Sequence, residues 1–310
     1  MNFLDRIDQE IRPILESPEI PRLNFGAGIE RVRAAMAQQQ ASITWPEVAG
    51  VDVRDVTVPG FDHDNPDVTV RIYEPDTRLV DTVLFWIHGG GMVVGGYGDN
   101  DFMCKIWSSR FGCRVTSVEY RLAPEHPYPA PLHDCYAGLR WVSQEMASEI
   151  VVIGASAGGG LAAGTVLLAR DHGEVGVRAQ ILIYPMIDDR DATPSCHEIT
   201  YEKVWNRDAN KYGWASYLGG LTDVPIYAAP ARATVDQLRG LPPTFIDVGE
   251  LDAFRDEDIA YAQKLLQAGV PCELVVTPGA FHGSESYHPK APTSKRINAA
   301  RFDAIGRALA

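Results

Sequence analysis

The chain has few cysteines and no long hydrophobic run. Its 310 residues include five cysteines, with no C-x-x-C pair among them: Cys104, Cys113, Cys135, Cys196 and Cys272. An odd number at wide spacing argues against a disulfide framework and is typical of reduced thiols in a cytoplasmic protein. No stretch approaches the roughly 18 apolar residues of a membrane span. Residues 1–13 are charged throughout, so we expect no secretory signal and no membrane partner.

Positive charge is also scarce. The chain has 28 Lys and Arg residues against 41 Asp and Glu residues, a formal net charge of −13. A nucleic-acid-binding domain usually carries a basic patch, and no cluster of Lys and Arg is present, so we expect no nucleic-acid partner. No group of His, Cys, Asp or Glu has the spacing of metal ligands, so we expect no metal and no other cofactor.

Segments rich in Val, Ile and Thr predict a sheet of eight strands. Their approximate ranges are 51–58, 68–73, 82–87, 114–120, 150–153, 179–184, 244–249 and 272–277. The first two alternate between apolar and polar residues, which predicts an antiparallel, half-exposed edge. Later segments are continuous apolar runs, which predict central parallel strands covered on both faces. Helices are predicted at about 101–111, 131–143, 158–171, 259–268 and 291–308.

This alternation of strands and helices predicts an α/β fold with a mostly parallel sheet and helices on both faces. Residues 1–45 and 190–225 do not follow the alternation. The second of these segments is rich in large aromatic residues: Tyr201, Trp205, Tyr212, Trp214 and Tyr217. We expect the two segments to form a helical cap over the carboxyl edge of the sheet, and 46–189 with 226–310 to form the main domain. Ordinary crossover helices with buried aromatic side chains are the alternative.

The strongest local pattern is Gly154-Ala155-Ser156-Ala157-Gly158, which follows a predicted strand and precedes a predicted helix. It is a G-x-S-x-G sequence in the strand–turn–helix context in which a serine nucleophile sits on a sharp turn. The turn needs small neighbours, and all four are Gly or Ala. The positive end of the following helix favours negative charge that develops near the serine. We therefore expect Ser156 to be a nucleophile.

A second pattern, His88-Gly89-Gly90-Gly91, follows the third predicted strand. Three glycines let the backbone approach a ligand closely, and HGGG loops supply backbone N–H groups to the oxyanion hole of lipases and esterases. Two such groups, with the N–H of Ala157, would bind the oxygen of a tetrahedral intermediate. The loop lacks the G-K-[ST] ending of a phosphate-binding P-loop. His88 is expected to orient the loop rather than act as a base.

A serine nucleophile needs a base and an orienting carboxylate, which follow it in this order along the chain: serine, acid, histidine. His282 lies in the loop after the eighth predicted strand and is the expected base, with His288 as the alternative. Asp252 lies just after the seventh predicted strand and is the expected acid, with Glu250 as the alternative. The neighbouring Asp256 suits a helix N-cap.

Together these patterns resemble the hormone-sensitive-lipase-like esterases of the α/β-hydrolase fold. The resemblance rests on the serine turn, the HGGG loop, the segment 120–130 (YRLAPEHPYPA) and the segment 252–257 (DAFRDE), and it extends from about residue 51 to the C-terminus. It implies a Ser156–Asp252–His282 triad, with oxyanion donors at Gly90, Gly91 and Ala157. The 120–130 segment resembles the family's proline-rich structural turn, and its Ala123-Pro124 and Tyr128-Pro129 bonds are candidates for the cis form.

The sequence departs from the family pattern at three points. Ala155 replaces the usual Asp before the nucleophile, Ala253-Phe254 replaces Pro-Leu after the acid, and Met92 follows the HGGG loop where Trp or Phe is common. None of these positions belongs to the expected triad. Met92, with Trp205 or Trp214 from the expected cap, is a candidate wall of the substrate pocket.

These observations predict a serine carboxylic-ester hydrolase that acts through an acyl-enzyme on small-molecule esters of short or medium chain, or on compact esters. Lactone or amide hydrolysis on the same triad is the close alternative. A non-catalytic receptor on this fold is a more distant one, because related plant hormone receptors lack the triad histidine and His282 is present here. The resemblance is also compatible with a homodimer.

Overall fold

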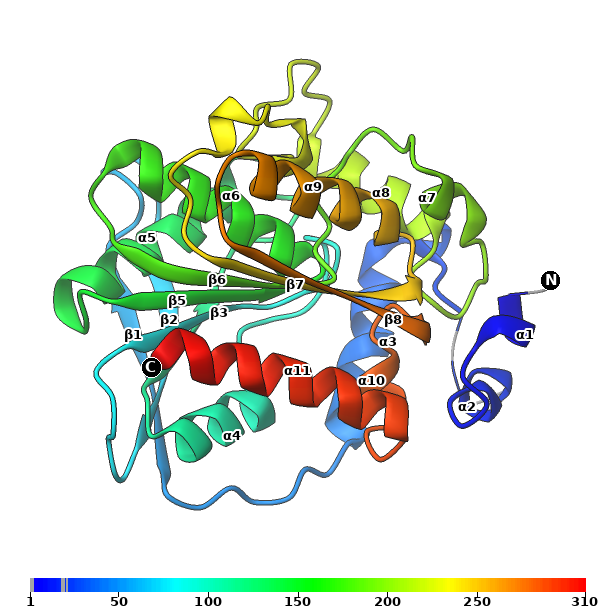
Figure 1. The fold of residues 1–310 in the computed structure, drawn as a ribbon, viewed down its shortest axis with the longest axis horizontal. Helices are drawn as coiled ribbons and strands as arrows, with labels where there is room; N and C mark the ends of the chain where they lie inside the picture. Colours follow the sequence, from blue (N-terminus) through cyan, green and yellow to red (C-terminus); the bar gives the residue numbers. More distant parts are fainter. Residues whose placement is uncertain (1–2, 18–19, 21) are drawn as a thin grey trace.

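The computed structural model describes residues 3–17, 20 and 22–310 (Figure 1). One eight-stranded sheet has the order β1-β2-β4-β3-β5-β6-β7-β8. Its strands are β1 (Val51–Val58), β2 (Val68–Pro75), β3 (Val83–Ile87), β4 (Val115–Glu119), β5 (Ile150–Ala155), β6 (Val177–Ile183), β7 (Thr244–Leu251) and β8 (Cys272–Phe281). All eight predicted strands are present.

The two kinds of strand pattern in the sequence correspond to two parts of the sheet. β1 pairs with β2 and β2 with β4 in antiparallel fashion, and every later pairing is parallel. β1 alternates in exposure along the sheet edge, whereas every residue of β3 is buried. β7 and β8 run further than predicted, because they continue to pair across an irregularity that contains a Pro-Gly sequence.

Helices cover both faces of the sheet (Figure 1). On one face, α4 (Asp101–Phe111) and α11 (Pro292–Leu309) pack against a core that includes Trp86 and Ile153. On the other face lie α5 (Ala130–Glu145), α6 (Ala157–His172) and α9 (Arg255–Gln267). The sequence predicted Asp256 as the N-cap of α9. The helix begins at Arg255, however, so Asp256 lies in its first turn.

The remaining helices gather near the carboxyl ends of β7 and β8 (Figure 1). They are α1 (Phe3–Arg6), α2 (Arg12–Glu16), α3 (Ile29–Ser42), α7 (Pro194–Glu198), α8 (Arg207–Leu218) and α10 (Ser284–Tyr287). Short 3-10 turns lie at Phe25–Ala27, Pro230–Arg232 and Asp236–Leu238. The segments 1–45 and 190–225 touch each other: Phe3 stacks on Tyr201 at 5.3 Å, and Phe25 packs edge-on against Trp205 at 5.8 Å.

Both proline bonds singled out in the sequence, Ala123-Pro124 and Tyr128-Pro129, are cis. Within the described ranges, no helix combines the length and apolar character needed to cross a membrane.

Candidate active site

Ser156 lies on a tight turn between β5 and α6. Its backbone has φ 58° and ψ −124°, a conformation that residues other than glycine rarely adopt. A Cβ at Gly154 would lie 2.1 Å from the carbonyl oxygen of Gly158, and a Cβ at Gly158 would lie 2.2 Å from that of Ile87. The glycines of the G-x-S-x-G sequence are therefore required by the close approach of the backbone.

The structure brings the three expected triad residues into one hydrogen-bonded chain. Nε2 of His282 lies 3.0 Å from Oγ of Ser156, and Nδ1 lies 2.8 Å from Oδ2 of Asp252. Asp252 is fully buried, and its other oxygen accepts a hydrogen bond of 3.0 Å from the Phe254 N–H. Of the two acid candidates it is thus Asp252 that meets the imidazole. His288 lies beyond α10, at that helix's C-terminal cap.

The HGGG loop passes directly beside the serine turn. A Cβ at Gly89 would lie 2.9 Å from the Ala155 carbonyl oxygen and 3.3 Å from Cβ of Ser156. Gly90 and Gly91 have φ of 113° and 61°, and the Gly90 carbonyl accepts the N–H groups of Val93 and Val94, both at 3.0 Å. The loop therefore closes as a compact turn against Ser156, and α6 begins on its other side at Ala157.

His88 is buried behind this loop and has the features of a structural residue. Its ring stacks on Tyr120 at 4.1 Å, and its Nδ1 lies 2.8 Å from the Gly89 carbonyl oxygen, which can only accept. The Tyr120 hydroxyl donates to the His88 carbonyl at 2.9 Å. Burial lowers the pKa of His88 to about 4, so the ring is neutral near pH 7 and holds the loop in place.

Aromatic rings surround the imidazole of His282. Tyr184 and Phe254 meet it edge-to-face, with centroids at 4.5 and 5.1 Å, and Trp205 lies at 6.4 Å. No sequence pattern predicted Tyr184 or Phe254 as a neighbour of the catalytic histidine. A signal existed for each: Tyr184 directly follows β6 at the carboxyl edge, and Phe254 is one of the departures from the family pattern. Both rings restrict the tilt of the imidazole.

A buried ionic network lies behind Tyr184, and it too was not predicted. The Tyr184 hydroxyl donates to Glu285 at 2.8 Å, and Arg301 of α11 donates to Glu285 at 2.6 Å and to Asp247 at 2.7 and 2.9 Å. Burial raises the pKa of Asp247 to about 6 although Arg301 opposes the shift. Burial also disfavours the charge of Glu285, but Arg301 outweighs it and lowers the pKa of that carboxyl. The network joins α10 and α11 to β7.

The three candidate pocket residues lie in different surroundings. Met92 is fully buried with φ 63°, next to the glycine loop. A Cβ at Gly91 would lie 2.2 Å from the Trp205 ring, so that indole lies directly on the loop. Trp214 is buried in α8 and its ring contact is with Tyr217 at 6.1 Å. The geometry favours Met92 and Trp205 over Trp214 as neighbours of the reacting atoms.

Among the described residues, one group of three side chains could share a metal ion: Asp62, His63 and Asp64. All three are exposed and lie between β1 and β2, and exposed acidic groups are common without an ion. The group shares no residue with the Ser156 site.

Comparisons with known proteins identify the family of this chain. Residues 84–286 match a family model described as the alpha/beta hydrolase fold. The chain is 35% identical to carboxylesterase NlhH of Mycobacterium tuberculosis over 294 residues, 91% of this chain and 90% of that protein. It is 31% identical to an ethyl acetate hydrolase of Pseudomonas putida, covering 71% of this chain and 72% of that protein. Among solved structures, a bacterial heroin esterase matches all of both chains, with a TM-score of 0.92 and 40% identity.

Proposed function

The chain belongs to the hormone-sensitive-lipase-like family of α/β hydrolases and is a carboxylic ester hydrolase, and we propose that Ser156, Asp252 and His282 carry its reaction. The observation that supports these roles is the unbroken chain of hydrogen bonds from Asp252 through His282 to Ser156, at 2.8 and 3.0 Å. Nucleophile, base and orienting acid stand in the order and geometry that acyl transfer requires.

The proposed reaction has two halves. In the first, Nε2 of His282 takes the hydroxyl proton as Oγ of Ser156 attacks the ester carbonyl, and the alcohol leaves with that proton as the acyl-enzyme forms. In the second, His282 takes a proton from water, which attacks the acyl carbon, and the proton returns to Ser156 as the acid leaves. Asp252 holds the imidazole in the tautomer that presents Nε2 to the serine.

We assign the oxyanion hole to the backbone N–H groups of Gly90, Gly91 and Ala157. Support comes from the tight approach of the glycine loop to Ser156 and from the start of α6 at Ala157. Donors fixed in this way stabilise the oxyanion without reorganising during the reaction.

We further propose that segments 1–45 and 190–225 act as a cap that limits substrate size, with 46–189 and 226–310 as the catalytic domain. The Trp205 ring lies on the HGGG loop and near His282. An indole in this position leaves little room for a long acyl chain and favours short- or medium-chain and compact esters. A relative named for ethyl acetate hydrolysis is consistent with this preference. Five free thiols support a cytoplasmic location, and a homodimer is part of the proposal by family resemblance.

The test is a panel of p-nitrophenyl esters from acetate to laurate, assayed below their solubility limits, with a lactone and an anilide of matched acyl size and an emulsified long-chain triglyceride. We expect the highest kcat/KM on the short and medium esters. A lactone or anilide turned over faster than the matched ester would favour the alternative chemistry, and a preference for emulsified long-chain triglyceride would contradict the size argument.

A further inference from the structure

The two strands that carry the acid and base loops separate just before the catalytic residues. Gly249 of β7 pairs with Thr277 of β8, and the next pair is Leu251 with Phe281. One residue of β7, Glu250, therefore faces a bulge of three residues, 278–280, in β8. Bulges re-aim the residues that follow them and are common beside active sites. His282 follows Phe281 directly, so this bulge lies immediately before the strand end that carries the imidazole.

The central residue of the bulge, Gly279, is held on both sides. Its N–H donates to the Glu250 carboxylate at 3.0 Å, and its carbonyl accepts the Asp8 N–H at 3.1 Å. Its φ is 71°, and a Cβ there would lie 3.0 Å from the Asp8 nitrogen. The bulge thus depends on a side chain from β7 and on the backbone of the N-terminal segment.

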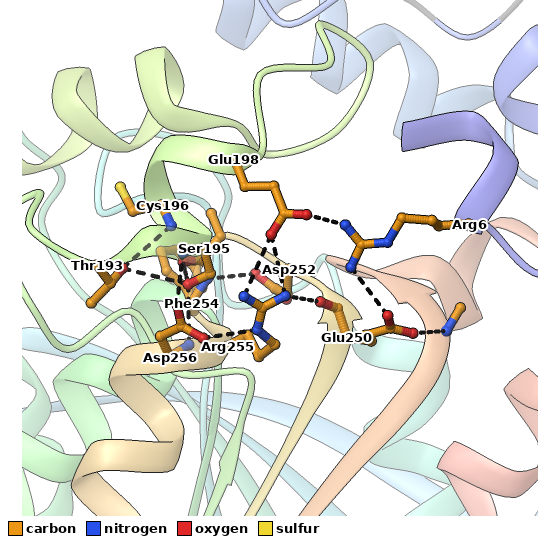
Figure 2. A network of polar contacts seen from close by, with 12 residues as sticks. Arg6, Thr193, Ser195, Cys196, Glu198, Glu250, Asp252, Phe254, Arg255 and Asp256 are labelled. Atoms are coloured by element: carbon orange, nitrogen blue, oxygen red, sulfur yellow. Dashed lines mark hydrogen bonds and ion pairs between the residues drawn. The ribbon is translucent and has the colours of Figure 1, made fainter. Parts of the chain in front are cut away.

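Glu250 is in turn held by one charged group of the N-terminal segment, the Arg6 guanidinium. Arg6 of α1 pairs with Glu250 at 3.1 Å and also with Glu198 of α7 (Figure 2). The Gly279 N–H is the main group that lowers the pKa of Glu250; partial burial opposes the shift and Arg6 adds to it. The carboxylate is therefore ionised near pH 7, which strengthens its hydrogen bond to the bulge.

The same network reaches the acid loop. Arg255 donates to the Glu250 carbonyl at 2.7 Å and lies 3.4 Å from Glu198. Asp256 accepts the Ser195 N–H of α7 at 2.7 Å. Figure 2 shows these contacts together with Asp252, whose backbone carbonyl accepts the Arg255 N–H at 3.2 Å. Charged contacts thus connect α1, α7, the acid loop and the β8 bulge.

We propose that Glu250 is a positioning residue for the catalytic base: its carboxylate, held by Arg6, shapes the β8 bulge that aims His282 at Ser156. This role rests on the triad proposed above and gives the alternative acid candidate a separate task. Glu250 does not contact the reacting atoms and acts through the Gly279 backbone. A base displaced by about 1 Å costs roughly 10²-fold in rate, so the effect should appear in kcat rather than in KM.

The experiment separates the two contacts of Glu250. Glu250→Leu removes both the acceptor and the charge and should lower kcat roughly 10²-fold with little change in KM. Glu250→Gln keeps an oxygen that can accept the Gly279 N–H and should lower kcat about tenfold or less. Arg6→Gln should lower kcat a few-fold, and the Arg6→Gln/Glu250→Gln pair should be clearly less than additive because the two residues share one contact.

Arg12→Gln is the matched control, since its partners Asp5 and Glu16 lie within the same N-terminal segment. It should leave kcat unchanged. All rates are measured well below each unfolding midpoint, so that lost activity does not reflect lost fold. If Glu250→Leu fails to fold, the double-mutant cycle between Arg6→Gln and Glu250→Gln still tests the proposal.

Ser156→Ala and Asp252→Asn, measured in parallel, keep the two proposals distinguishable. A kcat within twofold of wild type in Glu250→Leu, additive losses in the cycle, or a loss confined to KM or to the unfolding midpoint would overturn the positioning role while leaving the triad intact. A dead Glu250→Gln beside an active Asp252→Asn would make Glu250 the acid and would overturn both.

Discussion

Two helices of similar length, α6 and α3, are held in place by different forces. α6 has 16 residues, and all of them from Ala157 to Ala169 are buried. α3 has 14 residues, and none is buried. α6 lies behind the serine turn in the main core, whereas α3 belongs to the segment we assign to the cap. Apolar burial, at about 25 cal/mol per Å², thus holds the helix behind the nucleophile, whereas α3 packs only partly buried side chains such as Ile29 and Val32 against the core.

The polar contacts that attach α3 to the rest of the protein come from Arg33 and Gln40. Arg33 donates to the carbonyls of Val93 and Ala123 at 2.9 and 3.0 Å and forms a bidentate pair with Glu125 at 2.7 and 2.8 Å. It holds the pKa of Glu125 at about 2. Gln40 donates to the Asp99 carbonyl at 2.9 Å. The helix behind the nucleophile is thus held by packing, whereas α3 also relies on a few polar contacts that single substitutions can release.

The largest effect on turnover is expected from substitutions in the catalytic triad. Ser156→Ala and His282→Ala should each lower turnover roughly 10⁴-fold, because triad members act as a unit. Chemical unfolding curves should stay close to wild type. Ester turnover by Ser156→Ala within tenfold of wild type would contradict the assignment of the nucleophile.

A smaller effect is expected within the cap, where two buried indoles have different neighbours. Trp205→Ala opens space over Gly91 and should shift the acyl-chain optimum toward longer chains, with kcat/KM on the best wild-type ester falling roughly tenfold. Trp214→Ala removes an indole of comparable burial and should cost about 3–5 kcal/mol of stability without moving the optimum. The chain-length series measures both. If Trp214→Ala moves the optimum and Trp205→Ala does not, the pocket wall lies elsewhere.

A smaller effect on kcat/KM is expected when the polar contacts of α3 are removed. Arg33→Gln removes the contacts to the Val93 and Ala123 carbonyls and should lower kcat/KM about three- to tenfold, while the partly exposed ion pair contributes only about 0–1 kcal/mol to unfolding. The exposed Arg31 on the same helix provides the control, and Arg31→Gln should have no effect. Equal losses in both variants would mean that charge, and not the attachment of α3, is responsible.

The smallest effect concerns a buried carboxyl of α9. Asp258 is fully buried and neither oxygen has a hydrogen-bond partner among the described residues. Burial, with the nearby Glu257 and Asp252, raises its pKa well above the usual range. Its cost to stability is absent below the unfolded pKa of about 3.9 and grows as the pH rises toward the folded pKa. Asp258→Asn should therefore raise the thermal midpoint by about 2–4 °C at pH 8 and by less at pH 4.

Asp256 lies in the same helical turn, and its substitution by Asn should change the thermal midpoint in the opposite direction. Burial opposes its ionisation, but Arg255 and the Ser195 N–H outweigh burial and lower its pKa. Its stabilising contribution is present above the unfolded pKa and is lost as the pH falls through the folded one. Asp256→Asn should lower the midpoint at pH 8 more than at pH 4. Equal shifts at both pH values in either variant would contradict the titration argument.

Patterns local in the sequence predicted much of this molecule. Strand periodicity marked all eight strands, and the G-x-S-x-G and HGGG sequences marked the serine turn and the glycine loop, because both depend on backbone approaches that only small residues allow. Position at the ends of the parallel strands pointed to Asp252 and His282 ahead of Glu250 and His288, and the family resemblance implied the same pair. Each of these inferences needs only neighbouring residues and the rule that parallel strands end at one edge of the sheet.

Only the tertiary structure determined what surrounds and aims the histidine. The rings of Tyr184 and Phe254, the Arg301 network, and the Arg6–Glu250–Gly279 contacts join residues separated by up to 244 positions. The periodicity of the sequence does not predict such pairs, because each side chain by itself resembles an ordinary surface charge or core aromatic residue. Local patterns therefore identify which groups can perform the chemistry. Long-range packing and ion pairing position those groups, since only folding brings their partners within contact distance.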